Sequence, residues 1–205
     1  QGVSGALVMN ANPFTLGHQY LLETAAAPCD TLHLFVLSED ASLVPFAVRK
    51  KLVRAGVSHI PNVVLHDSGP YIISSATFPS YFLKDAASVI EGHARLDLAV
   101  FTKIAEALNV TKRFVGEEPT SQVTGLYNEI MAQELPKAGI ECHVVPRKQA
   151  AGQAISASTV RLALQKGDWE TLKMLVPQTT LDYFQSPEAA PVLERIRRAD
   201  NVIHY

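Results

Sequence analysis

The chain has 205 residues, enough for one large domain or for one domain with a small appendage. Hydrophobic residues make up 47% of it and charged residues 19%, which excludes intrinsic disorder and collagen-like or low-complexity assemblies. The formal net charge of −2 excludes a general basic field for nucleic acid or membrane binding, so a charged ligand needs a local site. No apolar run approaches the ~20 residues of a membrane helix and no signal peptide is recognisable, which predicts a cytoplasmic protein.

Short apolar or β-branched runs alternate with helical patterns, which is typical of βαβ units and a mainly parallel sheet. We expect strands at Gly5–Asn10, Thr31–Leu37, Asn62–His66, Lys112–Val115 and Glu141–Val145. Between them we expect helices at Leu16–Ala26, Phe46–Val57, Phe78–Glu91, Asp97–Leu108 and Gln122–Leu135, the third and fourth as a pair. This order predicts an α/β fold in three layers, with a five-stranded sheet in the middle.

The sequence changes character after the last expected strand. Short helices are expected at Ser156–Gln165 and Asp168–Val176, followed by a solvated terminal helix at Ala190–Asp200. We therefore divide residues 1–205 into an α/β core, residues 1–150, and a helical appendage, residues 151–205. Because the chain begins at Gln1 directly before a strand, we also expect that a preceding domain is missing from it.

The two cysteines, Cys29 and Cys142, are far apart and form no CxxC pair, which argues against a disulfide framework or a cysteine zinc site. We expect both to be small buried residues in a reducing compartment. Five histidines share no metal-ligand spacing, so we assign no metal residues and expect ordinary polar or half-buried side chains: His33, His59, His93, His143 and His204.

The strongest local motif lies between the first strand and the first helix and reads Asn10-Ala11-Asn12-Pro13-Phe14-Thr15-Leu16-Gly17-His18. A helix start offers unpaired N–H groups and a partial positive charge, which favour phosphate. Thr15 can cap the helix, Gly17 allows close approach to the backbone, and His18 lies one turn in, facing the same anion. The alternative is an ordinary Asn-Pro turn with a threonine cap and a surface histidine.

A second motif, Ile155-Ser156-Ala157-Ser158-Thr159-Val160-Arg161, lies at another expected helix start. Ser156 or Ser158 can cap this helix, and Arg161 can face the same anion as the caps. The alternative is a serine cap with an exposed arginine. Two phosphate-type motifs in one chain are more specific than either alone.

Together these motifs resemble the nucleotidyltransferase superfamily of adenylyl- and cytidylyltransferases, which implies a Rossmann-like, HUP-type fold. In that superfamily the motif histidine and the late arginine steady the β and γ phosphates while a nucleophile attacks the α phosphorus. The resemblance implies catalytic roles for His18, Thr15 and Arg161. It implies nucleotide binding by Asn10, Asn12, Gly17, Ser156 and Ser158.

One departure points to a particular branch, because Met9-Asn10-Ala11 replaces the usual Gly-x-Phe before the Asn-Pro. The stretches Tyr71–Phe82 and Thr111–Pro119, with the first motif, resemble the ligase domain of citrate lyase ligases over essentially the whole chain. The acetyltransferase-like N-terminal domain that such ligases carry is not in this sequence.

The resemblance implies a two-step reaction. ATP adenylates acetate with release of pyrophosphate, and the acetyl group passes to the thiol of the phosphoribosyl-dephospho-CoA arm on the acyl carrier subunit of citrate lyase. Mg²⁺ is implied by the ATP chemistry, without identified ligands. Two alternatives stay open: an adenylyltransferase acting on phosphopantetheine or nicotinate mononucleotide, and a nucleotide-binding regulatory module without turnover.

Several further residues are weaker candidates. Gly116 follows the fourth strand and is expected either to meet the ribose or adenine or to form a surface turn. Arg49 is expected on a solvated helix face, with a phosphate contact as the alternative. His66, Asp67 and Ser68 are candidates for the acyl or thiol site. The segment Phe78–Phe82 is expected either to line a pocket for the acid or to pack in the core. Arg147 and Lys148 are expected either at the rim that meets the carrier or in a solubilising loop.

Overall fold

The computed structural model describes residues 2–82 and 86–203. The chain forms two compact units, each assembled from separate segments of the sequence. Unit 1 comprises residues 1–9, 24–39 and 62–146, and unit 2 comprises residues 10–23, 40–61 and 147–205. The division into a core and an appendage at residue 150 stays a prediction.

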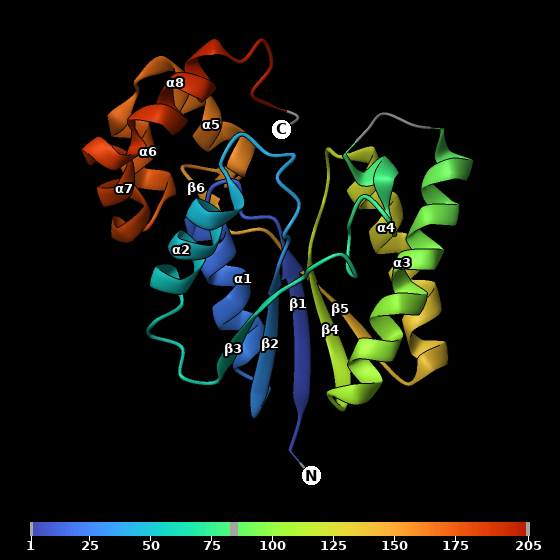
Figure 1. Ribbon diagram of the computed structural model, residues 1–205. Helices are drawn as coiled ribbons and strands as arrows, with labels where there is room; N and C mark the ends of the chain where they lie inside the picture. Colours follow the sequence, from blue (N-terminus) through green and yellow to red (C-terminus); the bar gives the residue numbers. More distant parts are fainter. Residues whose placement is uncertain (1, 83–85, 204–205) are drawn as a thin grey trace. The chain divides into compact units, whose positions relative to one another are not determined.

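Unit 1 contains a sheet of five strands in which every neighbouring pair is parallel. The strand order is β3-β2-β1-β4-β5 (Figure 1). It reverses between β1 and β4, and at such switch points open α/β sheets bind ligands beyond the carboxyl ends of their strands. All five predicted strands are confirmed, with ends that shift by at most two residues: β1 (Ser4–Met9), β2 (Thr31–Val36), β3 (Val63–Asp67), β4 (Val110–Gly116) and β5 (Glu141–Val145).

The predicted pair of helices between β3 and β4 was wrong. One long helix, α3 (Ala87–Ala107), runs through the expected break, because its apolar face continues at helical spacing from Ile90 through Leu98 to Ala105. Only a short 3₁₀ helix, η1 (Pro79–Tyr81), precedes it. Residues 83–85 of the predicted helix lie outside the described residues.

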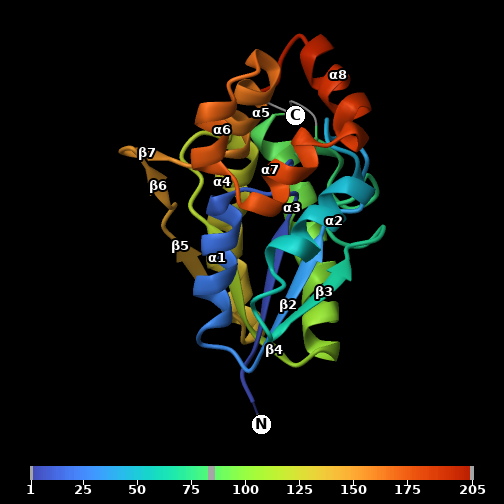
Figure 2. The same ribbon diagram turned by 90° about the vertical axis from the view of Figure 1, so that its left-hand side faces the viewer.

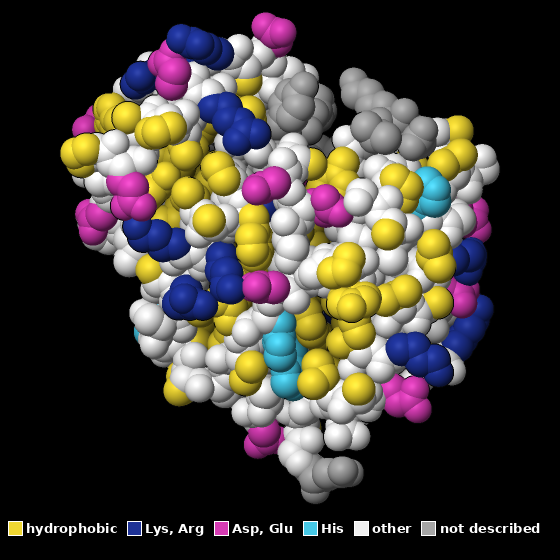
Figure 3. All heavy atoms as spheres, in the orientation of Figure 1, with side chains coloured by type: hydrophobic (Ala, Val, Ile, Leu, Met, Phe, Trp, Pro, Cys, Tyr) yellow, Lys and Arg dark blue, Asp and Glu magenta, His cyan; other side chains and the backbone are white. Residues whose placement is uncertain are grey.

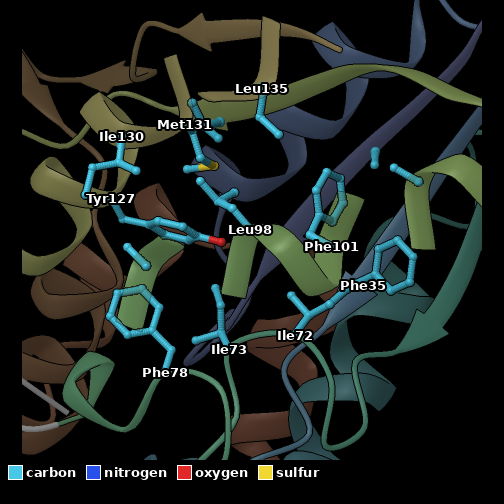
Figure 4. Packing of buried hydrophobic residues seen from close by; sticks show 14 of the residues in the cluster. Phe35, Ile72, Ile73, Phe78, Leu98, Phe101, Tyr127, Ile130, Met131 and Leu135 are labelled. Atoms are coloured by element: carbon cyan, nitrogen blue, oxygen red, sulfur yellow. The ribbon is translucent and has the colours of Figure 1, made fainter. Parts of the chain in front are cut away.

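The core of unit 1 lies between the sheet and two helices, α3 and α4 (Gln122–Glu134), which lie on the same side of the strands in Figure 1. Ser121 starts α4 by accepting a hydrogen bond from the Thr124 amide at 3.3 Å. After a 3₁₀ turn, η2 (Leu135–Ala138), the chain leaves through Gly139 at φ 76°, a conformation that glycine adopts without strain. Figure 4 shows Phe78, Leu98 and Tyr127 packed together in this core.

One carboxylate is buried inside this apolar core. Asp97 on α3 is fully buried and accepts hydrogen bonds from the Ile73 amide at 2.5 Å, from Thr77 Oγ1 at 3.0 Å and from the Tyr127 hydroxyl. Burial raises the pKa of Asp97, and these hydrogen bonds oppose the shift. Asp97 thereby holds the segment 73–77, in which Ile73 has a left-handed φ of 45°.

Unit 2 contains the remaining helices, of which the four C-terminal ones gather together in Figure 2. The helix α7 and the hairpin β6–β7 were not predicted. The hairpin turns at Ala151 and Gly152, which both have positive φ, as a two-residue hairpin turn of type I′ requires. The elements are α1 (Leu16–Ala26, with residues 24–26 in unit 1), α2 (Phe46–Gly56), β6 (Gln149–Ala150), β7 (Gln153–Ala154), α5 (Ala157–Lys166), α6 (Trp169–Leu175), α7 (Gln178–Gln185), η3 (Pro187–Ala189) and α8 (Ala190–Arg198).

Within the described residues, no helix combines the length and the apolar character that crossing a membrane requires.

Candidate functional site

The first motif forms a loop, residues 10–15, that joins the end of β1 to the start of α1; we call it the motif loop. Thr15 caps α1, because its Oγ1 accepts hydrogen bonds from the amides of Gly17 at 3.1 Å and His18 at 3.3 Å. The predicted cap is therefore confirmed. It leaves the first turn of α1 with the partial positive charge of a helix N-terminus.

His18 is fixed by the same turn. Its Nδ1 accepts a hydrogen bond from the Thr15 amide at 3.0 Å, so in the neutral imidazole the ring proton lies on Nε2. The ring also stacks on Phe14, with 5.7 Å between the ring centroids. Burial lowers the pKa of His18 to about 4, and the charges of Arg147 and Arg161 contribute to the shift. His18 is thus a neutral side chain that can donate one hydrogen bond from Nε2 near pH 7.

The two motifs lie side by side in unit 2. A Cβ added at Gly17 would lie 3.4 Å from the carbonyl oxygen of Ile155, so glycine lets the first turn of α1 approach the first residue of the second motif. Arg161 Nη1 donates to the Asn12 carbonyl at 2.8 Å, which joins the second motif to the motif loop. The resemblance implies that both motifs hold the β and γ phosphates of one nucleotide, and the fold brings the two motifs together in unit 2.

The second motif starts α5 as predicted. Ser156 is its N-cap and accepts a hydrogen bond from the Thr159 amide at 3.2 Å. The helix ends at Gly167 with φ 66°. Ser158 lies in the first turn, where its Oγ accepts a hydrogen bond from Arg161 Nη2 at 3.4 Å.

The guanidinium of Arg161 is also bonded to the C-terminal segment of the chain. Its Nε donates to the Val202 carbonyl at 2.5 Å and its Nη2 to the Ile203 carbonyl at 2.8 Å. Ser158 Oγ donates to the same Ile203 carbonyl at 3.0 Å. The alternative prediction for Arg161, an exposed side chain, is wrong, since only 5% of its surface is accessible to solvent. Burial lowers the pKa of Arg161 to about 10, which leaves it cationic at neutral pH.

Arg49 contradicts the prediction of a solvated helix face, because it is fully buried on α2. Its Nε donates to the Val44 carbonyl at 2.9 Å, and its Nη1 donates to the Asn10 carbonyl at 3.0 Å. The sequence carried a signal that we missed: Arg49 lies three and four positions before Leu52 and Val53, on the buried face of the helix.

The two asparagines of the motif loop bond to the segment before α2. Asn12 Oδ1 accepts from the Val44 amide at 3.0 Å, and Asn10 Nδ2 donates to Ser42 Oγ at 2.9 Å. Asn10 Oδ1 is buried and has no hydrogen-bond partner. Both asparagines therefore shape the loop, and Asn10 keeps one unused acceptor inside it.

Gly116 belongs to unit 1, where it ends β4 and accepts a hydrogen bond at its carbonyl from Asn128 Nδ2 at 3.0 Å. Its contact with a nucleotide stays a prediction.

Near the end of β3, His66 Nε2 lies 2.9 Å from His33 Nδ1, and Ser68 Oγ accepts from the Ser38 amide at 2.9 Å. The acyl or thiol role of this strand end also stays a prediction.

The aromatic segment 78–82 packs into the core of unit 1. Phe78 is fully buried, and its ring forms T-shaped contacts with those of Tyr81, His93 and Tyr127. This packing favours the core alternative over a pocket wall for Phe78.

The remaining histidines and the cysteines are ordinary side chains where the structure describes them. Cys29 and Cys142 are free and half-buried, less buried than expected. His204 lies outside the described residues. Each of the other three histidines has a polar partner: His59 with Glu23 at 2.8 Å, His93 with Ser80 Oγ at 2.7 Å and His143 with Glu141 at 2.8 Å.

Comparison with known proteins places this site in a family. A family model described as the citrate lyase ligase C-terminal domain matches residues 4–184. The chain belongs to this family. The family therefore agrees with the resemblance drawn from the sequence motifs.

Two relatives give the scale of the match. The citrate (pro-3S)-lyase ligase of Haemophilus influenzae is 46% identical over 187 residues, which cover 88% of this chain and 56% of that protein. The citrate (pro-3S)-lyase ligase of Klebsiella pneumoniae is 45% identical over 184 residues, which cover 87% of this chain and 54% of that protein. The chain thus spans about half the length of the relatives it matches.

A solved structure supports the fold. The nicotinic acid mononucleotide adenylyltransferase of Plasmodium falciparum superposes with a TM-score of 0.58 at 14% identity, over 90% of this chain and 94% of that chain. With the parallel sheet of unit 1, this likeness confirms the predicted Rossmann-like nucleotidyltransferase fold.

Proposed function

We propose that this chain is the ATP-dependent part of an acid:thiol ligase that activates acetate as acetyl-adenylate and acetylates the carrier subunit of citrate lyase. The observation that carries the proposal is the junction of the two motifs in unit 2, through Gly17 against Ile155 and through Arg161 on Asn12. Family membership supports the same reaction.

In the first half-reaction a carboxylate oxygen of acetate attacks the α phosphorus of ATP, and the bond from that phosphorus to the pyrophosphate oxygen breaks. Negative charge develops on the leaving pyrophosphate. His18 donates from Nε2 to that charge, and Arg161 stabilises it electrostatically. Because acetate is already an anion, no strong general base is needed, and catalysis rests on positioning and charge stabilisation.

In the second half-reaction the sulfur of the phosphoribosyl-dephospho-CoA arm attacks the acetyl carbon, the C–O bond to AMP breaks and the thiol proton goes to solvent. We propose that Lys148 binds this arm as it approaches. Lys148 is exposed on a loop, and its ammonium lies 5.9 Å from the centroid of the Tyr20 ring. Arg147, the other half of the predicted rim pair, also acts on His18 through its charge, so we assign it to the phosphates as well.

The predicted Mg²⁺ has no cage of protein ligands, because the described residues contain no group of three or more His, Cys, Asp or Glu placed to hold a metal ion. When bound with ATP, Mg²⁺ supplies charge neutralisation on the phosphates, where it commonly keeps phosphate and water ligands. No step above depends on it.

The test is exchange of radiolabelled pyrophosphate into ATP by this chain. We expect exchange that requires acetate. Exchange that requires phosphopantetheine or nicotinate mononucleotide instead would establish the adenylyltransferase alternative. ATP binding without exchange under any acceptor would establish the regulatory module. Transfer of labelled acetate to the holo carrier subunit then tests the second half-reaction.

A further inference from the structure

The motif loop is held from both sides by buried arginines. Arg161 on α5 donates to the Asn12 carbonyl, and Arg49 on α2 donates to the Asn10 carbonyl. Between these two anchors Ala11 has a φ of 53°, a left-handed conformation that is unfavourable for a non-glycine residue. The surrounding contacts therefore determine the shape of the loop.

Arg49 connects the motif loop to the segment before α2 in a closed ring of hydrogen bonds. Its second donor binds the Val44 carbonyl, while the Val44 amide donates back to Asn12 Oδ1. Ser42 Oγ accepts from Asn10 Nδ2 and closes the ring. One planar guanidinium thus fixes two backbone carbonyls, which a lysine ammonium cannot match in geometry.

Helix α2 also contacts the loop by packing. A Cβ at Gly56 would lie 2.1 Å from the ring of Phe14, so that the aromatic ring lies directly against the helix backbone. Phe14 is fully buried and stacks on His18. A displacement of α2 or of the loop is therefore passed to the His18 ring.

From these contacts we infer that Arg49 is a positioning residue that fixes the motif loop, and with it His18, for pyrophosphate departure. This inference rests on the proposed function. Arg49 itself is buried against backbone carbonyls, so it acts through Asn10 and not by touching the nucleotide. A misplacement of about 1 Å in such a loop costs on the order of 10²-fold in rate.

The test compares three variants in acetate-dependent pyrophosphate exchange and in an NMR titration of His18. Arg49→Met removes the guanidinium with both of its hydrogen bonds, and Arg49→Lys keeps the positive charge without the planar guanidinium. Arg54→Met is the matched control, since it removes an exposed arginine from the same helix. We expect Arg49→Met to lower kcat about 10²-fold, Arg49→Lys to restore only part of it, and Arg54→Met to match the parent.

The titration provides a readout independent of activity. Because burial lowers the pKa of His18 and Phe14 of the motif loop stacks on its ring, Arg49→Met is expected to raise this pKa from about 4 toward its ordinary value. If Arg49→Met does not fold, Ser42→Ala loosens the same ring more gently and is expected to give smaller shifts in the same directions. An unchanged kcat and an unchanged His18 pKa in the folded variants would overturn the inference. Absence of exchange in the parent chain would instead overturn the proposed function, while the titration would still decide whether Arg49 positions His18.

Discussion

The two units differ in charge. Unit 1 carries six Lys and Arg against twelve Asp and Glu, a net charge of −6, whereas unit 2 carries twelve against eight, a net charge of +4. Figure 3 shows Lys and Arg side chains over α2 and over the C-terminal helices of unit 2. The whole-chain charge of −2 conceals this division, and unit 2, which contains both phosphate-type motifs, is the cationic one.

The units also bury ions in different ways. Unit 1 buries the carboxylate of Asp97 among side-chain and amide donors inside an apolar core. Unit 2 buries the guanidinium groups of Arg49 and Arg161 against backbone carbonyls of the motif loop. The first arrangement ties a loop to a core, and the second holds the loop to which the proposed function assigns an anion. Changes in unit 1 are therefore expected to affect stability most, and changes in unit 2 to affect rate most.

The largest expected effect is on the stability of unit 1. Asp97→Ala removes the acceptor of three hydrogen bonds, which come from Ile73, Thr77 and Tyr127. It also removes the negative charge that acts on Arg113, which is 2% exposed and has two side-chain nitrogens without hydrogen-bond partners. Removing one partner of a buried ionic cluster costs about 3–5 kcal/mol in the free energy of unfolding. Urea unfolding measures this loss in the free energy of unfolding.

The matched control for Asp97 is Glu106→Ala on the same helix. Glu106 is exposed and pairs with Lys103 at 3.7 Å, so a change within about 0.5 kcal/mol is expected. A loss below 1 kcal/mol for Asp97→Ala would show that the core of unit 1 does not depend on its buried carboxylate.

The next effect is on the rate in unit 2. His18→Ala removes the donor that the proposed function assigns to the leaving pyrophosphate, and loss of one such donor costs on the order of 10²-fold or more in kcat. Acetate-dependent exchange measures the loss. His59→Ala, an exposed histidine paired with Glu23 in the same unit, is expected to leave exchange unchanged. Near-parental exchange in folded His18→Ala would remove His18 from the mechanism.

His18 also gives unit 2 a pH dependence of known sign. The pKa of His18 is about 4 in the folded chain, below its ordinary value of 6.5, so the folded state binds this proton less tightly than the unfolded state. Its contribution to stability is complete above about pH 6.5 and is lost as the pH falls toward 4. A plot of pyrophosphate exchange against pH should accordingly show no inflection from His18 near pH 6.5.

The sequence predicted regular elements and caps better than it predicted buried charges. Thr15 and Ser156 cap helices through local hydrogen bonds, which depend on neighbouring residues and are visible in sequence. Arg49 and Asp97 depend on partners 24 to 39 positions away, at Asn10 and Ile73. A charged residue on an apolar helical face signals such burial, but its partner is fixed only by the fold. The long helix α3 was missed because charged residues interrupt its apolar pattern, among them Asp97 on the buried face.

The smallest expected effect concerns the C-terminal segment that binds Arg161. The carbonyls of Val202 and Ile203 accept hydrogen bonds from Nε and Nη2 of this guanidinium, to which the proposed function assigns electrostatic stabilisation of the leaving pyrophosphate. A bound phosphate competes with these carbonyls for the cationic guanidinium, because it offers a charged acceptor where each carbonyl is neutral. Deleting residues 202–205 is therefore expected to lower the apparent KM for ATP only about threefold, with kcat unchanged. Asn201→Ala, which removes the 2.9 Å bond from the Ile203 amide to Asn201 Oδ1, should shift KM in the same direction by less. A raised KM in both variants, with unfolding unchanged, would mean that the segment holds Arg161 in place for the nucleotide and does not compete with it.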